Sequence, residues 1–338
     1  MKLHSEILEY LHYHPESSRS EITDGIAIKA SPATLKRAIS EAVEQKLIHV
    51  TGKGKATKYS ITPQAHVLMT FDIDTYFEKE IDERTIQQGF NFELIQNILP
   101  RVILFSDEEL HHLNGLQATF TKNISQLSPL EYAKEMERLG IDLSWKSSQI
   151  EGNTYSLLET ERLLTEREEA KAIMLLNHKE ALKFILQEPD YLETLTISHI
   201  EDIHSILTDN LNVDRNIRSR RVGITGTNYR PLDNEFQIRE AMQDTCKLIN
   251  AKSCVFEKAL LALVLLSYIQ PFTDGNKRTA RIVSNSLLIA NSYCPISFRT
   301  VDSIDYKKAM LIFYEQNNIS AFKRIFMEQF EFAVNTYF

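Results

Sequence analysis

The strongest constraint on the fold is a stretch of residues 269–281, IQPFTDGNKRTAR, which lies between two apolar segments with helical patterns. An apolar run at 259–266 precedes it. Pro271 has no backbone N–H and its ring clashes with the preceding turn, so it predicts the end of the first helix. Gly275 allows backbone angles that other residues resist, and it lets a ligand come close. The stretch therefore predicts a helix, a short polar loop and a second helix.

The residue types in this loop favour an anionic ligand. The N–H groups around 275–277 would lie at the start of the second helix, where helices commonly bind anions. Arg278 and Arg281 are three residues apart and so share a helix face. Asp274 could hold a divalent cation through its oxygens. Taken alone, so short a motif is more often a plain turn followed by a solvated helix face.

The complete stretch resembles the signature of the Fic family, His-Pro-Phe-x-Asp/Glu-Gly-Asn-Gly/Lys-Arg-x-x-Arg. Every fixed position matches except the first, where this chain has Gln270. The resemblance implies ATP as the ligand, Mg²⁺ at Asp274, and transfer of AMP to a Ser, Thr or Tyr hydroxyl of a target protein. It also implies a set of nucleotide-binding residues, namely Gly275, Asn276, Lys277, Arg278 and Arg281.

Gln270 bears on the chemistry because the histidine of the family accepts the proton of the attacking hydroxyl. An amide can hydrogen-bond and orient a group, but it has no basic nitrogen. Loss of a general base costs on the order of 10²–10⁴ in rate. The sequence therefore predicts retained nucleotide binding and impaired transfer.

A second stretch, SSQIEGN at 147–153, ends a helical pattern that starts at Ser128-Pro129. Gly152 suits a left-handed helix end. The stretch resembles the inhibitory motif of the Fic family, Ser/Thr-x-x-x-Glu-Gly/Asn, with Ser147 and Glu151 at its fixed positions. The resemblance implies an inhibitory helix at 131–152 whose glutamate pairs with Arg281. A carboxylate placed there competes with an incoming phosphate for the same guanidinium.

A third stretch, RRVGITGTNYRP at 220–231, combines glycines with short alternation and predicts a β-hairpin. It could be any surface hairpin. In the Fic family a hairpin at this place is the flap that holds a target segment by strand addition. The resemblance implies target contacts at Thr225, Thr227 and Tyr229.

The first 65 residues predict three helices followed by two short strands around a Gly-Lys turn. Ser31-Pro32 is a strong helix start. This order resembles a winged helix-turn-helix domain, in which the third helix enters the major groove and the wing contacts phosphates. The residues expected to contact DNA are basic: Lys36, Arg37, Lys53, Lys55 and Lys58. Winged helices also serve as protein-docking modules, so this alternative stays open.

The expected architecture is mostly α. It comprises a winged helix-turn-helix domain at 1–65, connecting helices at 66–127, and an all-helical Fic-like domain with its flap at 128–338. Within the last domain, Ser156-x-x-Glu159 predicts a helix start, with one or two helices over 157–186.

The composition of the 338 residues fits a globular protein with a net charge of −8. Three cysteines without Cys-x-x-Cys spacing indicate thiols in a reducing compartment. The first residues lack the apolar core of a signal peptide, and the apolar run at 259–266 is too short to cross a bilayer. We expect a cytoplasmic protein without membrane contact, and the sequence leaves homo-oligomerisation open.

Three functions fit these features. The first is an autoinhibited adenylyltransferase that Gln270 impairs. The second is a non-catalytic nucleotide-binding transcriptional regulator that acts through the winged helix. The third is a scaffold that docks proteins.

Overall fold

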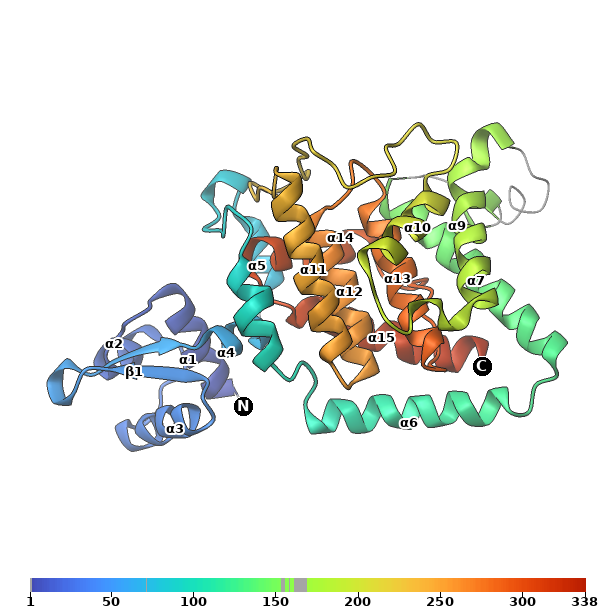
Figure 1. The fold of residues 1–338 in the computed structure, drawn as a ribbon. Helices are drawn as coiled ribbons and strands as arrows, with labels where there is room; N and C mark the ends of the chain where they lie inside the picture. The colour runs from blue at the N-terminus through green and yellow to red at the C-terminus, as the bar shows by residue number, and fades with distance from the viewer. Residues whose placement is uncertain (1, 71, 153–155, 158, 161–168) are drawn as a thin grey trace.

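The computed structural model describes residues 2–70, 72–152, 156–157, 159–160 and 169–338. In these residues the chain is mostly helical and has a single two-stranded sheet (Figure 1). The mostly α fold class is therefore confirmed.

The N-terminal unit forms in the predicted order of three helices and two strands, and it has a hydrophobic core of its own. Ser31 caps the third helix by accepting a hydrogen bond from the Thr34 N–H at 3.1 Å. The strands are antiparallel, with Ile48 opposite Ile61. The elements are α1 (Lys2–Tyr13), α2 (Arg19–Gly25), α3 (Pro32–Glu44), β1 (Ile48–Thr51) and β2 (Lys58–Ile61).

The segment that follows this unit packs against the helical core of the rest of the chain. Buried residues such as Val67, Leu99 and Phe105 belong to that core. Arg84 pairs with the buried Glu315 at 3.1 Å, which fixes the segment to the C-terminal half. The helices are α4 (Pro63–Leu68), α5 (Ile73–Glu78) and α6 (Asp107–Ile124), the last running along one edge of the molecule (Figure 1).

The remaining helices surround α12, which from Ala259 to Ile269 is buried and almost entirely apolar. A helix without a polar face is stable only inside other layers. The helices around it include α13, which packs closely along it. They are α7 (Pro129–Ile150), α9 (Glu169–Gln187), α10 (Ile197–Leu207), α11 (Glu235–Ala251), α12 (Val255–Ile269), α13 (Asn276–Ala290), α14 (Ser303–Gln316) and α15 (Ser320–Tyr337).

Part of the helical pattern expected at 157–186 lies outside the described residues, at 158 and 161–168, and so does Asn153 at the end of the second stretch. The helix start at Ser156 is present, because Ser156 Oγ accepts from the Glu159 N–H at 3.2 Å. Across the described residues, we find no helix with the length and apolar character needed to cross a membrane.

Candidate functional site

The loop between α12 and α13 has the predicted boundaries. Helix α12 ends at Ile269, and Gln270 adopts a left-handed conformation with φ of 52°. Helix α13 begins after Gly275, whose φ is 80°. Because the first N–H groups of a helix have no acceptor within it, the start of α13 presents backbone donors toward the loop.

The side chain of Asn276 holds the loop in shape. Its Oδ1 accepts from the Phe272 N–H at 2.8 Å, and its Nδ2 donates to the Phe272 carbonyl at 2.8 Å. Nδ2 also donates to Gln270 Oε1 at 3.0 Å, and Gln270 Nε2 donates to the Ser267 carbonyl at 2.6 Å. Both ends of the Gln270 amide are therefore engaged within the protein.

Arg281 lies entirely inside the protein, where α7 supplies most of its partners. Its Nε donates to Ser147 Oγ at 2.9 Å, and its Nη2 donates to Glu151 Oε1 at 2.9 Å. The guanidinium carbon lies 5.6 Å from the centre of the Tyr306 ring. The α7 end and the α13 start, 130 residues apart, are thus joined by one arginine.

Glu151 is at the C-terminal end of α7, and its side chain is 24% exposed. Burial alone would raise the pKa of its carboxyl. Arg281, together with Lys277 at 3.2 Å, outweighs burial and lowers the pKa of Glu151 to about 2. The carboxylate is therefore ionised at neutral pH and bridges two cations of α13.

Arg278 and Asp274 form a second pair. Arg278 Nη2 donates to Asp274 Oδ2 at 3.0 Å, although the arginine side chain is 4% exposed and the aspartate 67%. Arg278 Nη1 is buried and has no hydrogen-bond partner in the described residues. A buried cationic donor without a partner is costly, and an anionic ligand would relieve that cost.

A cavity of about 540 Å³ opens beside the loop and brings together residues from four segments. Glu151 comes from α7, Gln270 and Lys277 from the loop and α13, and Thr225 from the segment between α10 and α11. Tyr306 and Lys307 line it from α14. Four further predicted site residues are buried and do not line this cavity, namely Ser147, Asn276, Arg278 and Arg281.

The β-hairpin expected at 220–231 does not form, so this prediction was wrong. In this segment the chain makes no paired strands, and its one backbone bridge joins Arg230 to Gly89 in the parallel sense. Thr225 reaches the cavity, while Thr227 Oγ1 accepts from the Tyr229 N–H at 3.0 Å. The alternation of apolar and polar residues that suggested a hairpin instead places the ring of Tyr229 in the core.

Tyr229 itself is a core residue rather than a surface contact. It is 3% exposed, its hydroxyl donates to the Tyr268 carbonyl at 3.1 Å, and its ring stacks on that of Tyr268 at 4.8 Å. The expected contact with a target is therefore corrected for this residue.

Sequence reasoning missed two residues that support the loop. The ring of His204, on α10, stacks on Phe272 at 3.7 Å, and its Nε2 lies 3.0 Å from the Asp274 carbonyl oxygen. Arg218 is buried and its Nε donates to the Gln270 carbonyl at 2.6 Å. Both contacts join positions more than 50 residues apart, so no local pattern could indicate them.

The basic residues of the N-terminal unit are distributed over α3 and the turn between the strands. Lys36, Arg37, Lys53 and Lys55 are exposed. Lys58 is half-buried and pairs with Glu21 at 3.0 Å. Lys53 and Lys55 in the turn are therefore more exposed than Lys58, and DNA binding stays a prediction.

No cluster of three or more His, Cys, Asp or Glu side chains suited to a metal occurs in the residues that the structure describes. Asp274 offers a single exposed carboxylate. Mg²⁺ is often held by one or two carboxylates together with substrate phosphates, and one exposed aspartate is compatible with that mode of binding.

The family model described as Fic/DOC family matches residues 194–288, which include the loop and α13. Protein adenylyltransferase Fic of Nematostella vectensis is 28% identical over 175 residues, covering 48% of this chain and 40% of that protein. Protein adenylyltransferase fic-1 of Caenorhabditis elegans is 28% identical over 160 residues, covering 44% of this chain and 31% of that protein. The chain thus spans less than half of the length of these curated relatives.

Solved structures give the same fold. Fic-1 from C. elegans superposes with a TM-score of 0.58 at 20% identity, covering 68% of this chain and 72% of that one. A Fic domain containing signaling protein from Bacteroides thetaiotaomicron gives 0.56 at 22% identity, covering 67% and 96%. Residues 194–288 are therefore similar to the Fic/DOC family, and the helical fold around the loop before α13 is the fold of these solved structures.

Proposed function

We propose that the chain is a Fic-type protein adenylyltransferase that binds ATP with Mg²⁺ and modifies a hydroxyl of a target protein. The observation that carries the proposal is the contact of Glu151 with Arg281 beside the cavity at the loop. The names of the curated relatives, protein adenylyltransferases, give the reaction class.

The phosphates of ATP would lie at the start of α13. The N–H groups at 276–278 and the helix dipole favour negative charge there. Lys277 lines the cavity, and Arg278 has a buried donor without a partner among the described residues. These groups supply positive charge on two sides of one helix end.

Asp274 would hold Mg²⁺ together with the phosphates. The ion, when bound, neutralises phosphate charge during transfer. Because Arg278 also pairs with Asp274, the aspartate would orient the arginine as well.

Glu151 would act as the inhibitory group. It occupies Arg281 and Lys277 with a carboxylate, and an incoming phosphate would have to compete for these two cations. A like charge at this position also repels the triphosphate. Ser147 supports the arrangement by fixing the guanidinium from the same helix.

Gln270 would limit the reaction. The hydroxyl oxygen would bond to the α-phosphate while the bond to the β-phosphate breaks and pyrophosphate leaves, and the hydroxyl proton must be accepted by a base, which an amide is not. The amide is also held at both ends, by Asn276 and by the Ser267 carbonyl. The attack would therefore proceed without a general base at this position, and Thr225 and Thr227 would contribute only to holding the target segment.

The second candidate function is a non-catalytic nucleotide-binding regulator that acts through the N-terminal unit. The engaged amide of Gln270 favours it, since an orienting group at this position is compatible with binding but not with proton transfer. In this case the bound nucleotide would alter DNA or protein docking by α3 and the turn between β1 and β2.

Radiolabelled ATP distinguishes these functions when applied to the wild type, Glu151→Gly, Gln270→His and the double variant. Transfer of label by the double variant alone supports a disabled, autoinhibited enzyme. Binding of ATP by Glu151→Gly without transfer by any variant supports the regulator. Absence of ATP binding in every variant contradicts both, and Arg281→Ala serves as the matched control that removes the nucleotide cation.

A further inference from the structure

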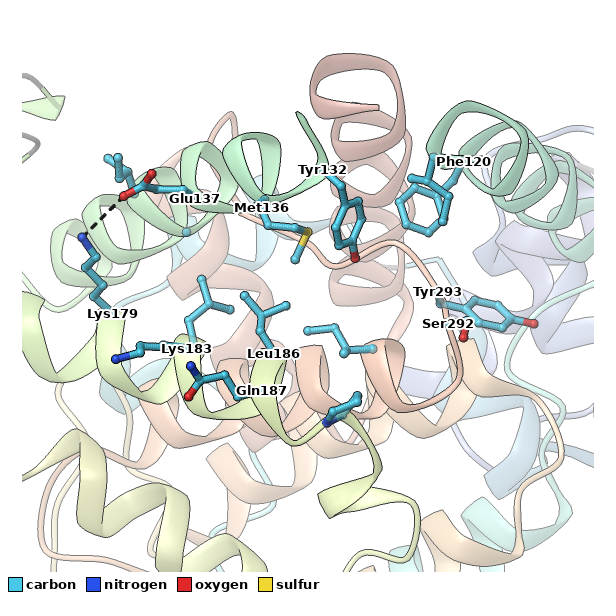
Figure 2. Close-up of a pocket in the computed structure, with 17 residues that line it drawn as sticks. Phe120, Tyr132, Met136, Glu137, Lys179, Lys183, Leu186, Gln187, Ser292 and Tyr293 are labelled. Carbon is cyan, nitrogen blue, oxygen red and sulfur yellow. Dashed lines mark ion pairs between the residues drawn. The ribbon is translucent and has the colours of Figure 1, made fainter. Parts of the chain in front are cut away.

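A second cavity, of about 610 Å³, lies between α7 and α9, and most of its lining is apolar (Figure 2). At its α9 end Lys179 pairs with Glu137 at 3.6 Å, the pair marked in Figure 2, and Lys183 pairs with Glu180 at 3.7 Å. These pairs balance one another in charge, so charge selects no ligand there. The loop cavity, the cavity of about 540 Å³ beside Gln270, differs because one buried cation joins two of its walls.

Two walls of the loop cavity come from segments that are far apart in the sequence. Helix α14 provides one of them, with Met310 and Tyr314 among its residues. The segment 223–226 provides another. A Cβ placed on Gly226 would lie 3.4 Å from Leu311 Cδ1, so the two walls are in contact at this glycine. The shape of the cavity therefore depends on how the segment is fastened to α14.

Arg84, in the segment that follows α5, bonds to both walls. Its Nη1 donates to Glu315 Oε1 on α14 at 3.1 Å, and its Nη2 donates to the Gly226 carbonyl at 3.0 Å. The arginine side chain is 4% exposed, and its guanidinium carbon lies 5.1 Å from the centre of the Phe77 ring. A guanidinium carries its donors in a rigid planar fork, so it can hold two acceptors in a fixed relation to each other.

The middle of the segment that carries this wall has few other anchors. Its two ends are fixed by buried side chains, Arg218 and Tyr229. Between these ends, residues 222–228 make two hydrogen bonds with other parts of the described chain, namely the bond from Arg84 and a bond from Asn228 Nδ2 to Asp82 Oδ1 at 2.8 Å. The second bond is exposed to water, whereas the guanidinium is buried, so Arg84 supplies the stronger anchor.

We propose that Arg84 is a positioning residue that fastens the segment 223–226 to α14 and so fixes the wall on which a target segment would lie. The part that concerns the target rests on the proposed function, in which Thr225 helps to hold it, whereas the fastening itself does not. Without the bond to Gly226 the wall is held mainly at its ends and moves on the nanosecond timescale of loops. Arg84 lies outside residues 194–288, so the shape of the site depends on a residue beyond the part that matches the family model.

The test measures the motion of the segment directly, in the full chain, with a nitroxide spin label on Thr225→Cys. Thr225 is exposed, so the label does not disturb the core. Cys254→Ser removes the cysteine that is only partly buried, and Cys246 and Cys294 are buried away from the reagent. The electron paramagnetic resonance spectrum then reports the rotation of the label at this one position.

The informative variant is Arg84→Met/Glu315→Gln. Removing the arginine alone would leave a buried carboxylate without its partner, whereas the double variant removes both charges. The glutamine amide keeps an acceptor for the Tyr76 hydroxyl, which donates to Glu315 at 2.6 Å. We expect the label to rotate at least about threefold faster in this variant. Arg84→Lys, which keeps the charge beside Glu315 but lacks the planar fork, should do the same and guards against a double variant that fails to fold.

Glu315→Gln alone separates positioning from stability. It breaks the ion pair and should lower the thermal unfolding temperature, but it keeps the bond from Arg84 to Gly226, so the label should rotate as in the labelled parent. The matched control is Lys252→Met/Glu257→Gln. Lys252 also joins a buried carboxylate, at 3.0 Å, to a backbone carbonyl, at 2.7 Å, but at the opposite end of α12 from the loop. This control should leave the rotation of the label unchanged.

Unchanged rotation of the label in Arg84→Met/Glu315→Gln and in Arg84→Lys would overturn the proposal. Equal loosening in Glu315→Gln or in the Lys252 control would overturn it as well, because motion would then follow stability rather than the bond to Gly226. The measurement needs neither ATP nor a target. A failure of adenylyl transfer would therefore contradict only the proposed function, and an immobile label would contradict only the positioning by Arg84.

Discussion

Glu151 Oε1 lies 2.9 Å from Arg281 Nη2, so the residue that caps the C-terminal end of α7 and the second turn of α13 meet in one ion pair. The arginine is completely buried and the glutamate is partly exposed. Removing the buried arginine would leave the carboxylate without its partner, whereas displacing the partly exposed glutamate would leave the buried cation available to another anion. In the second case a phosphate of the proposed nucleotide could bind the Arg281 guanidinium.

The first prediction concerns the loss of the ion pair between Glu151 and Arg281. In Glu151→Gln the carboxylate charge is lost while the side-chain size is kept, so ATP no longer competes with it for Arg281 and Lys277. We expect the dissociation constant of ATP to fall about tenfold, which corresponds to about 1.4 kcal/mol. Calorimetric titration with Mg-ATP measures it, with Glu137→Gln on the same helix as the control. An unchanged constant in Glu151→Gln would argue against inhibition by this residue.

The second prediction concerns pH. The folded pKa of Glu151, about 2, lies below its usual value of 4.5, so the ionised pair stabilises the fold above pH 4.5. This contribution is lost as the pH falls from about 4.5 toward 2. We expect the wild type to exceed Glu151→Gln in free energy of unfolding at pH 7, with the difference shrinking toward pH 3.

The difference between the two proteins is the quantity to measure, because other groups titrate as well. Burial lowers the pKa of His178 to about 3 and that of His12 to about 4, and both destabilise the fold as the pH falls below 6.5. The effect of His12 is common to wild type and variant and cancels in the difference, whereas the effect of His178 cancels only in part, because Glu151 raises the pKa of His178. Urea unfolding at pH 7, 5 and 3 checks it. A difference that stays constant over this range would contradict the assigned ion pair.

The third prediction concerns His204, which supports the loop from α10. Replacing it by leucine removes the contact of Nε2 with the Asp274 carbonyl and leaves that oxygen without its donor. We expect a loss of about 1–3 kcal/mol in the free energy of unfolding. His204→Gln, which keeps a donor, should lose less. His111→Leu, at an exposed position on α6, is the control, and equal effects at the two sites would refute the role of His204.

The same loop shows what the sequence could predict. Pro271 and Gly275 set the ends of α12 and α13 through local backbone chemistry, so these boundaries followed from the residues themselves. The pairing of Glu151 with Arg281 was expected only through the resemblance to a family. No rule of spacing connects residues 130 positions apart in the chain.

The contacts that were missed share one cause. Arg218 bonds to the Gln270 carbonyl because a buried guanidinium must find acceptors, and which acceptors lie nearby depends on the tertiary fold. The target contact of Tyr229 was expected only through the resemblance to a family, and it fails because the side chain is 3% exposed. Its ring packs with those of Tyr268 and Tyr314 in one cluster, in a core that the local sequence does not reveal.

The last prediction concerns the turn between β1 and β2. Lys53 and Lys55 are exposed there, and if they contact phosphates their removal weakens DNA binding without regard to sequence. In Lys53→Ala/Lys55→Ala we expect the slope of log K against log salt to become shallower by about 1.8, since each phosphate contact contributes about 0.9. Fluorescence anisotropy with a labelled duplex at several salt concentrations measures the slope. The control Lys122→Ala/Lys134→Ala removes two exposed lysines from α6 and α7 and should leave the slope unchanged. An equal change of slope in both double variants would show that the lysines act only through the net charge of the protein.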